Sequence, residues 1–272
     1  MIKLKQAMLA LLVLLVATGG SAGKAAASGT ALTPSIQAAF DLTAAQADSA
    51  ARARLLSLYQ ELTGLEAQYD KREEEIRRLH DGNAQALIAL RAKIKELDQA
   101  AVSRATATVE TAKKRYQPLF DQYSALNKQI ALLKGLKDKA LNAALRTQAD
   151  AMKLLVQAAR QDIREKEAQL KQVKQKRTDK MASARKTLSG IDSPQSSIKT
   201  QKSAASALNK RLSADFSDFK AAIRKKNAPL ALQSLSSLVS GYKQIAVNKQ
   251  KIVELEQKVS SVIAAVNKQI AG

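Results

Sequence analysis

The chain of 272 residues contains no cysteine and no tryptophan, and its only histidine is His80. Without cysteine there can be no disulfide, no thiol nucleophile and no lipid attached to an N-terminal cysteine. A single histidine is too few for the usual metal sites, so we expect no metal and no cofactor. The sequence also lacks a glycine-rich phosphate loop and a GxSxG element. These absences favour a protein that is not an enzyme and has no catalytic residues.

Aromatic residues and prolines are scarce as well. The chain has four Phe and five Tyr, and its four prolines are Pro34, Pro118, Pro194 and Pro229. Few large side chains and abundant Ala, Leu, Lys and Gln favour long helices with narrow apolar seams over a wide globular core. Each proline is expected to mark a helix start, a kink or a boundary.

The N-terminal segment has the features of a secretory signal peptide over residues 1–27. Lys3 and Lys5 precede an apolar run of about eleven residues, and small residues offer cleavage sites near Ala22 or Ala27. An uncleaved membrane anchor is the alternative, although the run is shorter than the roughly 20 residues of a spanning helix. We therefore expect an exported protein that is secreted, periplasmic or cell-wall associated, with residues 28–40 as a flexible leader.

Apolar residues spaced by three and four predict helices along the rest of the chain. The expected segments are a helix over 41–80, one long central helix over 83–188, and a C-terminal helical arm over 194–270 with a break near 227–229. The glycines at 82 and 190 are followed by helix-capping residues or proline, which predicts chain reversals at 80–83 and 189–194.

The predicted fold class is therefore all-α: an elongated antiparallel coiled coil, or long helical hairpins, around one long central helix that is kinked near Pro118. The two outer segments would fold back along the central helix and meet near that proline. A compact bundle, folded sharply at Pro118 and Pro229, is the structural alternative. The alanine-rich seams are thin, so the heptad faces could also bind another envelope protein or a second copy of the chain.

The formal net charge of +21 favours association with anionic partners. If the chain reverses at 189–194, one hairpin tip collects a dense group of cations. This predicted polyanion-binding set consists of Lys171, Lys174, Lys176, Arg177, Lys180, Arg185, Lys186, Lys199, Lys202, Lys210 and Arg211. The expected partner is an anionic envelope polymer or membrane surface. Nucleic acid is not expected, because an exported chain rarely meets it and few aromatics are present for base stacking. The alternative role of these cations is to keep an exposed hairpin soluble.

Two functions fit this pattern. The first is a structural or adaptor protein of the cell envelope, whose rod spaces components while the basic tip holds an anionic surface. The second is a periplasmic-type holdase chaperone for unfolded exported proteins. In its basic, exported, coiled-coil character the chain is similar to helical periplasmic chaperones and to the non-catalytic helical segments of secreted peptidoglycan hydrolases.

Overall fold

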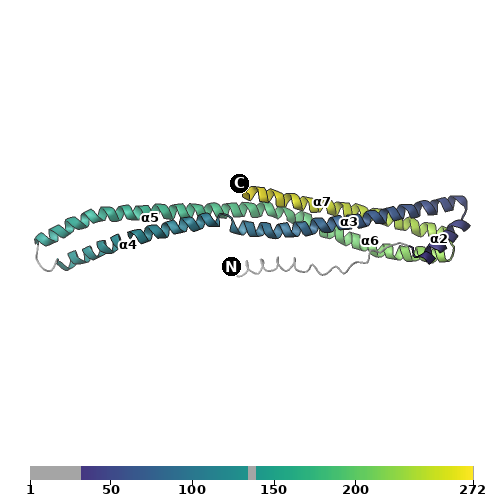
Figure 1. Ribbon diagram of the computed structural model, residues 1–272, viewed down its shortest axis with the longest axis horizontal. Coiled ribbons are helices and arrows are strands. Elements are labelled where there is room, and N and C mark those ends of the chain that lie inside the picture. The colour runs from purple at the N-terminus through teal and green to yellow at the C-terminus, as the bar shows by residue number, and fades with distance from the viewer. Residues whose placement is uncertain (1–31, 134–138, 272) are drawn as a thin grey trace. The chain divides into compact units, whose positions relative to one another are not determined.

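The computed structural model describes residues 32–133 and 139–271, and these residues form helices without any strand. The elements are α2 (Pro34–Gln46), α3 (Ser49–Glu96), α4 (Gln99–Leu133), α5 (Lys139–Leu188), the 3₁₀ turn η1 (Ser189–Ile191), α6 (Asp192–Arg224) and α7 (Ala228–Ala271) (Figure 1). The predicted all-α class with long packed helices is confirmed. The predicted signal peptide and residues 28–31 of the leader lie outside the described residues. The flexible leader expected up to residue 40 is wrong from Pro34 on, because α2 is helical and packs Phe40 and Ala44 into the core. The helix expected over 41–80 is interrupted at residues 47–48, between α2 and α3. None of the described helices is long and apolar enough to cross a membrane.

The described residues divide into two compact units. The bundle unit comprises residues 32–82 and 192–259, that is α2, most of α3, α6 and most of α7. The hairpin unit comprises residues 83–133, 139–191 and 260–271, that is α4, α5, η1 and the C-terminal ends of α3 and α7.

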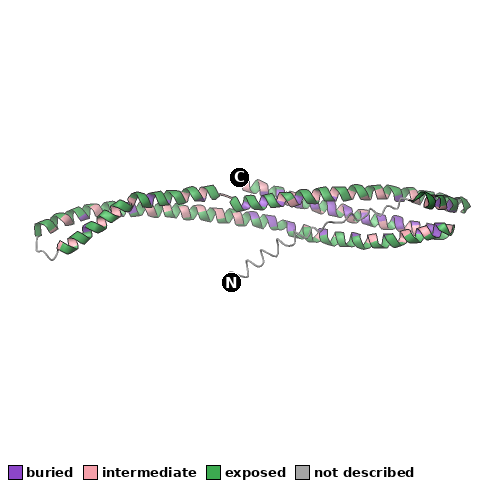
Figure 2. Ribbon diagram, turned by 60° about the horizontal axis from the view of Figure 1, so that its bottom comes forward, coloured by how far each residue is buried: buried purple, intermediate pink, exposed green. Residues whose placement is uncertain are grey.

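The core of the bundle unit lies between α3, α6 and α7 and is closed at one end by α2. Leu62, Phe219, Leu235 and Ile245 are fully buried there, and the facing sides of the helices are the buried ones (Figure 2). Phe40 of α2 packs against Phe219 with 6.0 Å between ring centroids. This is the seam that the leucine spacing of α3 and the C-terminal segment predicts.

Within the bundle unit, α3 and α7 run in parallel. Three polar pairs between them keep one register, because each α7 residue lies 176 positions after its α3 partner and successive pairs are seven residues apart. The pairs are Glu66 with Tyr242, Glu73 with Lys249, and His80 with Glu256. A seven-residue step returns to the same side of a helix, so the three pairs form one polar ladder along a shared face.

In the hairpin unit, α4 and α5 are antiparallel neighbours (Figure 1). The Tyr116 hydroxyl donates to Asp162 at 3.1 Å, and Lys113 forms an ion pair with Glu167 at 2.8 Å. Several buried residues of the seam lie three, four or seven positions apart. The buried residues are Val102, Val109, Ala112 and Leu126 of α4 and Ala149, Val156, Ala159, Ala184 and Leu188 of α5. Residues 134–138, which join α4 to α5 in the sequence, lie outside the described part.

The reversal predicted at residues 80–83 is wrong, because α3 continues through Gly82 to Glu96. Asn83, expected to cap a new helix, is buried and accepts a hydrogen bond from Ser260 at 2.6 Å. A helical glycine costs only about 1 kcal/mol relative to alanine, which side-chain packing readily offsets. The break falls instead at Leu97 and Asp98, where Asp98 adopts a left-handed backbone with φ of 51°.

The single central helix predicted over residues 83–188 is therefore divided into the end of α3, then α4 and α5. Within the hairpin unit, the neighbour of α4 is α5. Pro118 lies inside α4, which continues through it without a break.

The reversal predicted at residues 189–194 is also wrong. The chain is helical from Lys139 to Arg224 through the short 3₁₀ turn η1, with no extended residue at which it could fold back. Gly190 faces Val262, whose Cγ2 would lie 3.6 Å from an added Cβ, so the position sits against a packed neighbour. The break expected near 227–229 is found at residues 225–227. There Lys226 has a φ of 53°, and the Asn227 side chain accepts from the Leu230 amide at 3.1 Å to cap α7.

Candidate functional site

The eleven cations predicted to bind polyanions do not gather at a hairpin tip. Residues 171–186 lie in α5 and residues 199–211 in α6, and both belong to a helical run that does not reverse between them. The predicted tip is therefore not formed. Seven of the cations belong to α5 of the hairpin unit and four to α6 of the bundle unit.

Two of the seven predicted cations in α5, Arg177 and Lys180, contact the backbone and side chains at the break between α3 and α4. The Arg177 guanidinium donates to the carbonyl oxygens of Lys95 at 2.9 Å and Leu97 at 2.8 Å. These are orphan carbonyls at a helix end, where a cation is also favoured by the helix dipole. Lys180 forms an ion pair with Asp98 at 3.2 Å. Both side chains are thus engaged in structural contacts.

The other five α5 cations are exposed, and none makes an ion pair with a described residue. They are Lys171, Lys174, Lys176, Arg185 and Lys186. At about 100° per residue, four of them occupy about a third of the helix circumference, and Lys176 lies apart. The four that share this face, Lys171, Lys174, Arg185 and Lys186, are called the α5 cationic face below.

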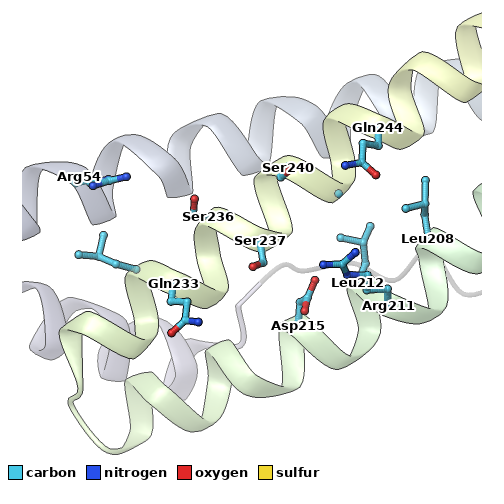
Figure 3. A pocket seen from close by; sticks show the side chains of 12 residues that line it. Arg54, Leu208, Arg211, Leu212, Asp215, Gln233, Ser236, Ser237, Ser240 and Gln244 are labelled. Carbon is cyan, nitrogen blue, oxygen red and sulfur yellow. The ribbon is translucent and has the colours of Figure 1, made fainter.

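In the bundle unit, Lys199, Lys202 and Lys210 are exposed along α6. Arg211 points to a different side of that helix and lines a groove of about 460 Å³ between α3, α6 and α7 (Figure 3). Arg54 of α3 lines the same groove. The structure thus separates Arg211 from the other predicted cations and joins it to an arginine that the sequence patterns did not single out.

The lining of the groove is mainly polar, with three leucines and one glycine among its twelve residues. Its full lining is Arg54, Leu208, Arg211, Leu212, Asp215, Leu232, Gln233, Ser236, Ser237, Ser240, Gly241 and Gln244. In Figure 3 the serines of α7 lie between Arg54 on one side and Arg211 with Asp215 on the other. Gly241 lets α7 approach Leu212 closely, since a Cβ there would lie 2.6 Å from Leu212 Cδ2.

The charged groups of the groove are unpaired within the described part of the chain: Arg54, Arg211 and Asp215 form no ion pair there. Two arginines against one aspartate leave the lining with one net positive charge. A guanidinium has five donors in a planar fork that suits phosphate and carboxylate groups. The groove can therefore accept an anionic group without first breaking a protein ion pair.

Groups suited to acid–base or metal chemistry do not converge in the described residues. No group of three or more His, Asp or Glu could hold a metal ion there. The resolved pKa shifts have local causes: a hydrogen bond from Lys166 lowers the pKa of Asp162, and a hydrogen bond to Glu167 raises the pKa of Lys113. Burial raises the pKa of the Tyr59 hydroxyl, with Glu66 contributing in the same direction. Each shift reflects a contact between neighbouring helices or turns.

The sequence contains one feature that marks the groove, a stretch of serines in α7. Residues 233–241 place four serines and a glycine within one stretch of helix, and these residue types are poor helix formers. An arginine at position 54, however, cannot be connected with that stretch until the fold brings α3 beside α7. Comparison of the chain with protein-family models, curated proteins and solved structures finds no match.

Proposed function

We propose that this protein is an exported, non-enzymatic helical protein of the cell envelope that binds a phosphate-bearing anionic surface in a structural or adaptor role. The supporting observation is the α5 cationic face, whose four side chains are exposed and have no acidic partner among the described residues. Unpaired cations attract anionic surfaces through a field that salt screens over about 10 Å at 0.1 M.

The antiparallel pairing of α4 with α5 gives this proposal a mechanical basis. Both helices are long, 35 residues for α4 and 50 for α5, and several buried residues of their seam lie three, four or seven positions apart. In an adaptor, such a hairpin holds its exposed cations in a fixed row, so that several of them can meet a polyanion together. Each cation near an anionic membrane surface contributes about 1 kcal/mol, so a row of four has a large combined effect.

The test is co-sedimentation of the mature protein with purified cell envelopes across a salt series. Replacement of the α5 cationic face by glutamine, in K171Q/K174Q/R185Q/K186Q, is expected to reduce the sedimented fraction and its salt sensitivity while the circular dichroism spectrum stays helical. The matched control is R52Q/R77Q/K251Q/K258Q, which removes four other exposed cations. Equal loss in both variants, or no loss in the α5 variant, would contradict the proposal.

A holdase chaperone is the second candidate, and a different observation favours it. Leu132, Leu154 and Leu155 of the hairpin unit are 76%, 67% and 61% exposed, and Leu154 and Leu155 are adjacent in the sequence. Such residues could contact the apolar segments of an unfolded chain. The test is suppression of the aggregation of an unfolded outer-membrane protein. L154Q/L155Q should lose this activity if the chaperone role is real, whereas the α5 cationic-face variant should retain most of it.

A further inference from the structure

We propose that the groove lined by Arg54 and Arg211 is a binding site for a sugar phosphate. The proposal deepens the proposed function, and it rests on that function for the choice of phosphate over carboxylate, since guanidinium groups bind both. It goes beyond the α5 cationic face because it assigns a discrete ligand site to the bundle unit.

The groove supplies several hydrogen-bond donors. The hydroxyls of Ser236, Ser237 and Ser240 form no hydrogen bond within the described residues. Two other serines, Ser213 and Ser234, donate to the carbonyl four residues earlier, at 3.1 and 3.0 Å. The groove serines therefore keep their donors available, beside two unpaired arginines. This combination matches the several acceptor oxygens of a phosphate.

The lining of the groove suits a sugar as well as an anion. Asp215 accepts but cannot donate when it is ionised, and it would repel a bare phosphate. A sugar hydroxyl, in contrast, donates to such a carboxylate and accepts from the amides of Gln233 and Gln244. Leu208 and Leu212 offer an apolar surface to the C–H groups of the ring. Asp215 thus selects for a ligand that carries hydroxyls next to its phosphate.

The groove is also large enough and open enough for a small ligand. A volume of about 460 Å³ lies within the roughly 300–1,000 Å³ range of small-molecule sites, which is the size class of a hexose phosphate. Arg54 and the polar residues of α7 that line the groove are exposed or half-buried, so the ligand can enter from solvent. The same chemistry can come from a free sugar phosphate or from a repeating unit of an envelope polymer.

The experiment is isothermal titration calorimetry of the full mature chain with α-glucose 1-phosphate, glucose and inorganic phosphate as separate probes. Glucose 1-phosphate is expected to bind more tightly than either of the other two. R54Q and R211Q should each weaken it roughly tenfold or more, the usual effect of losing a charged hydrogen-bond donor. D215N should reduce the preference for glucose 1-phosphate over inorganic phosphate.

The matched controls are R52Q on α3 and K210Q on α6, which remove an exposed cation near each groove arginine without altering the lining. Both should bind glucose 1-phosphate as the unmodified chain does. Equal weakening in the controls, unchanged binding in R54Q and R211Q, or equal affinity for inorganic phosphate would overturn the sugar-phosphate site. Circular dichroism checks the fold of each variant, and the D215N change in preference tests the site without removing a cation.

Co-sedimentation of R54Q/R211Q with envelopes, and of the unmodified chain in the presence of glucose 1-phosphate, tests this site separately from the proposed function and identifies the source of the ligand. If R54Q/R211Q loses glucose 1-phosphate but sediments with envelopes normally, the groove binds a free sugar phosphate. If saturating glucose 1-phosphate also releases the protein from envelopes, the groove holds a unit of the polymer. If envelopes are bound through the α5 cationic face while no probe binds the groove, the sugar-phosphate site is wrong and the envelope function stands.

Discussion

The pair of Lys249 and Glu73 provides a sharp test of the polar ladder between α3 and α7. The Lys249 side chain is only 4% exposed, whereas that of Glu73 is 49% exposed. The Lys249 ammonium also lies 3.7 Å from the centroid of the Tyr69 ring. The two partners therefore differ in what happens when one is left alone: Glu73 can be hydrated where it is, but Lys249 cannot.

This asymmetry sets the expected magnitudes. Leaving a buried charge without its partner typically costs about 3–5 kcal/mol. In E73Q, Lys249 keeps its contact with Tyr69, which is worth up to about 2 kcal/mol for a desolvated cation. We therefore expect E73Q to lower the free energy of unfolding by about 2 kcal/mol. K249M removes the buried charge and keeps a similar side-chain volume, so its effect should stay within about 1 kcal/mol of zero.

The measurement is urea unfolding followed by circular dichroism for E73Q, K249M and the double variant. The double variant should be no less stable than K249M, because the glutamine then replaces a hydrated carboxylate with no buried partner. A K249M variant that is less stable than E73Q would refute this reasoning, since it would mean that the ammonium itself stabilises the bundle. An unchanged E73Q would refute it as well, by showing that Lys249 finds hydration without its acid.

Three further predictions concern the helices themselves. Gly82→Ala should raise the free energy of unfolding by up to about 1 kcal/mol, because a Cβ there meets nothing within 4 Å in a continuous helix; a loss of stability in thermal melts would instead support a turn. Arg177→Ala should destabilise the hairpin unit by about 2 kcal/mol through its two carbonyl contacts, with Lys176→Ala as a silent control in urea titrations. The lowered pKa of Asp162, caused mainly by Lys166, contributes stability above the unfolded value near 3.8, and this contribution is lost as pH falls through the lower folded pKa. The free energy of unfolding of Asp162→Asn should therefore fall less than that of the unmodified chain when the pH drops below about 4. An identical fall in both chains would contradict this role of Asp162.

The sequence predicted the seams better than it predicted the turns. The spacing of Leu119, Tyr123, Leu126, Ile130 and Leu133 indicated one face of a helix, and these residues are buried or half-buried in α4. Gly82 and Gly190 were interpreted as helix stops, yet both lie in helical backbone. A glycine weakens a helix by about 1 kcal/mol, which is less than the burial of one or two leucines on the same face.

The candidate sites, too, were predicted only in part from the sequence. Lysine and arginine counts predicted an affinity for anions, and the five free cations of α5 remain available for it. The role of Arg177 could not be predicted, because its carbonyl partners lie about 80 residues earlier in the chain. The groove was equally hidden, since Arg54, Arg211 and the α7 serines come from three helices.

By itself, therefore, the sequence determined that this chain forms long amphipathic helices, because apolar spacing and the scarcity of proline act within each segment. It also determined the excess of positive charge. Only the tertiary structure decided where the chain turns, which helices pair, and which cations are occupied. Those choices depend on burial summed over contacts between distant residues, and that sum exceeds the small local preferences of single glycines and capping residues.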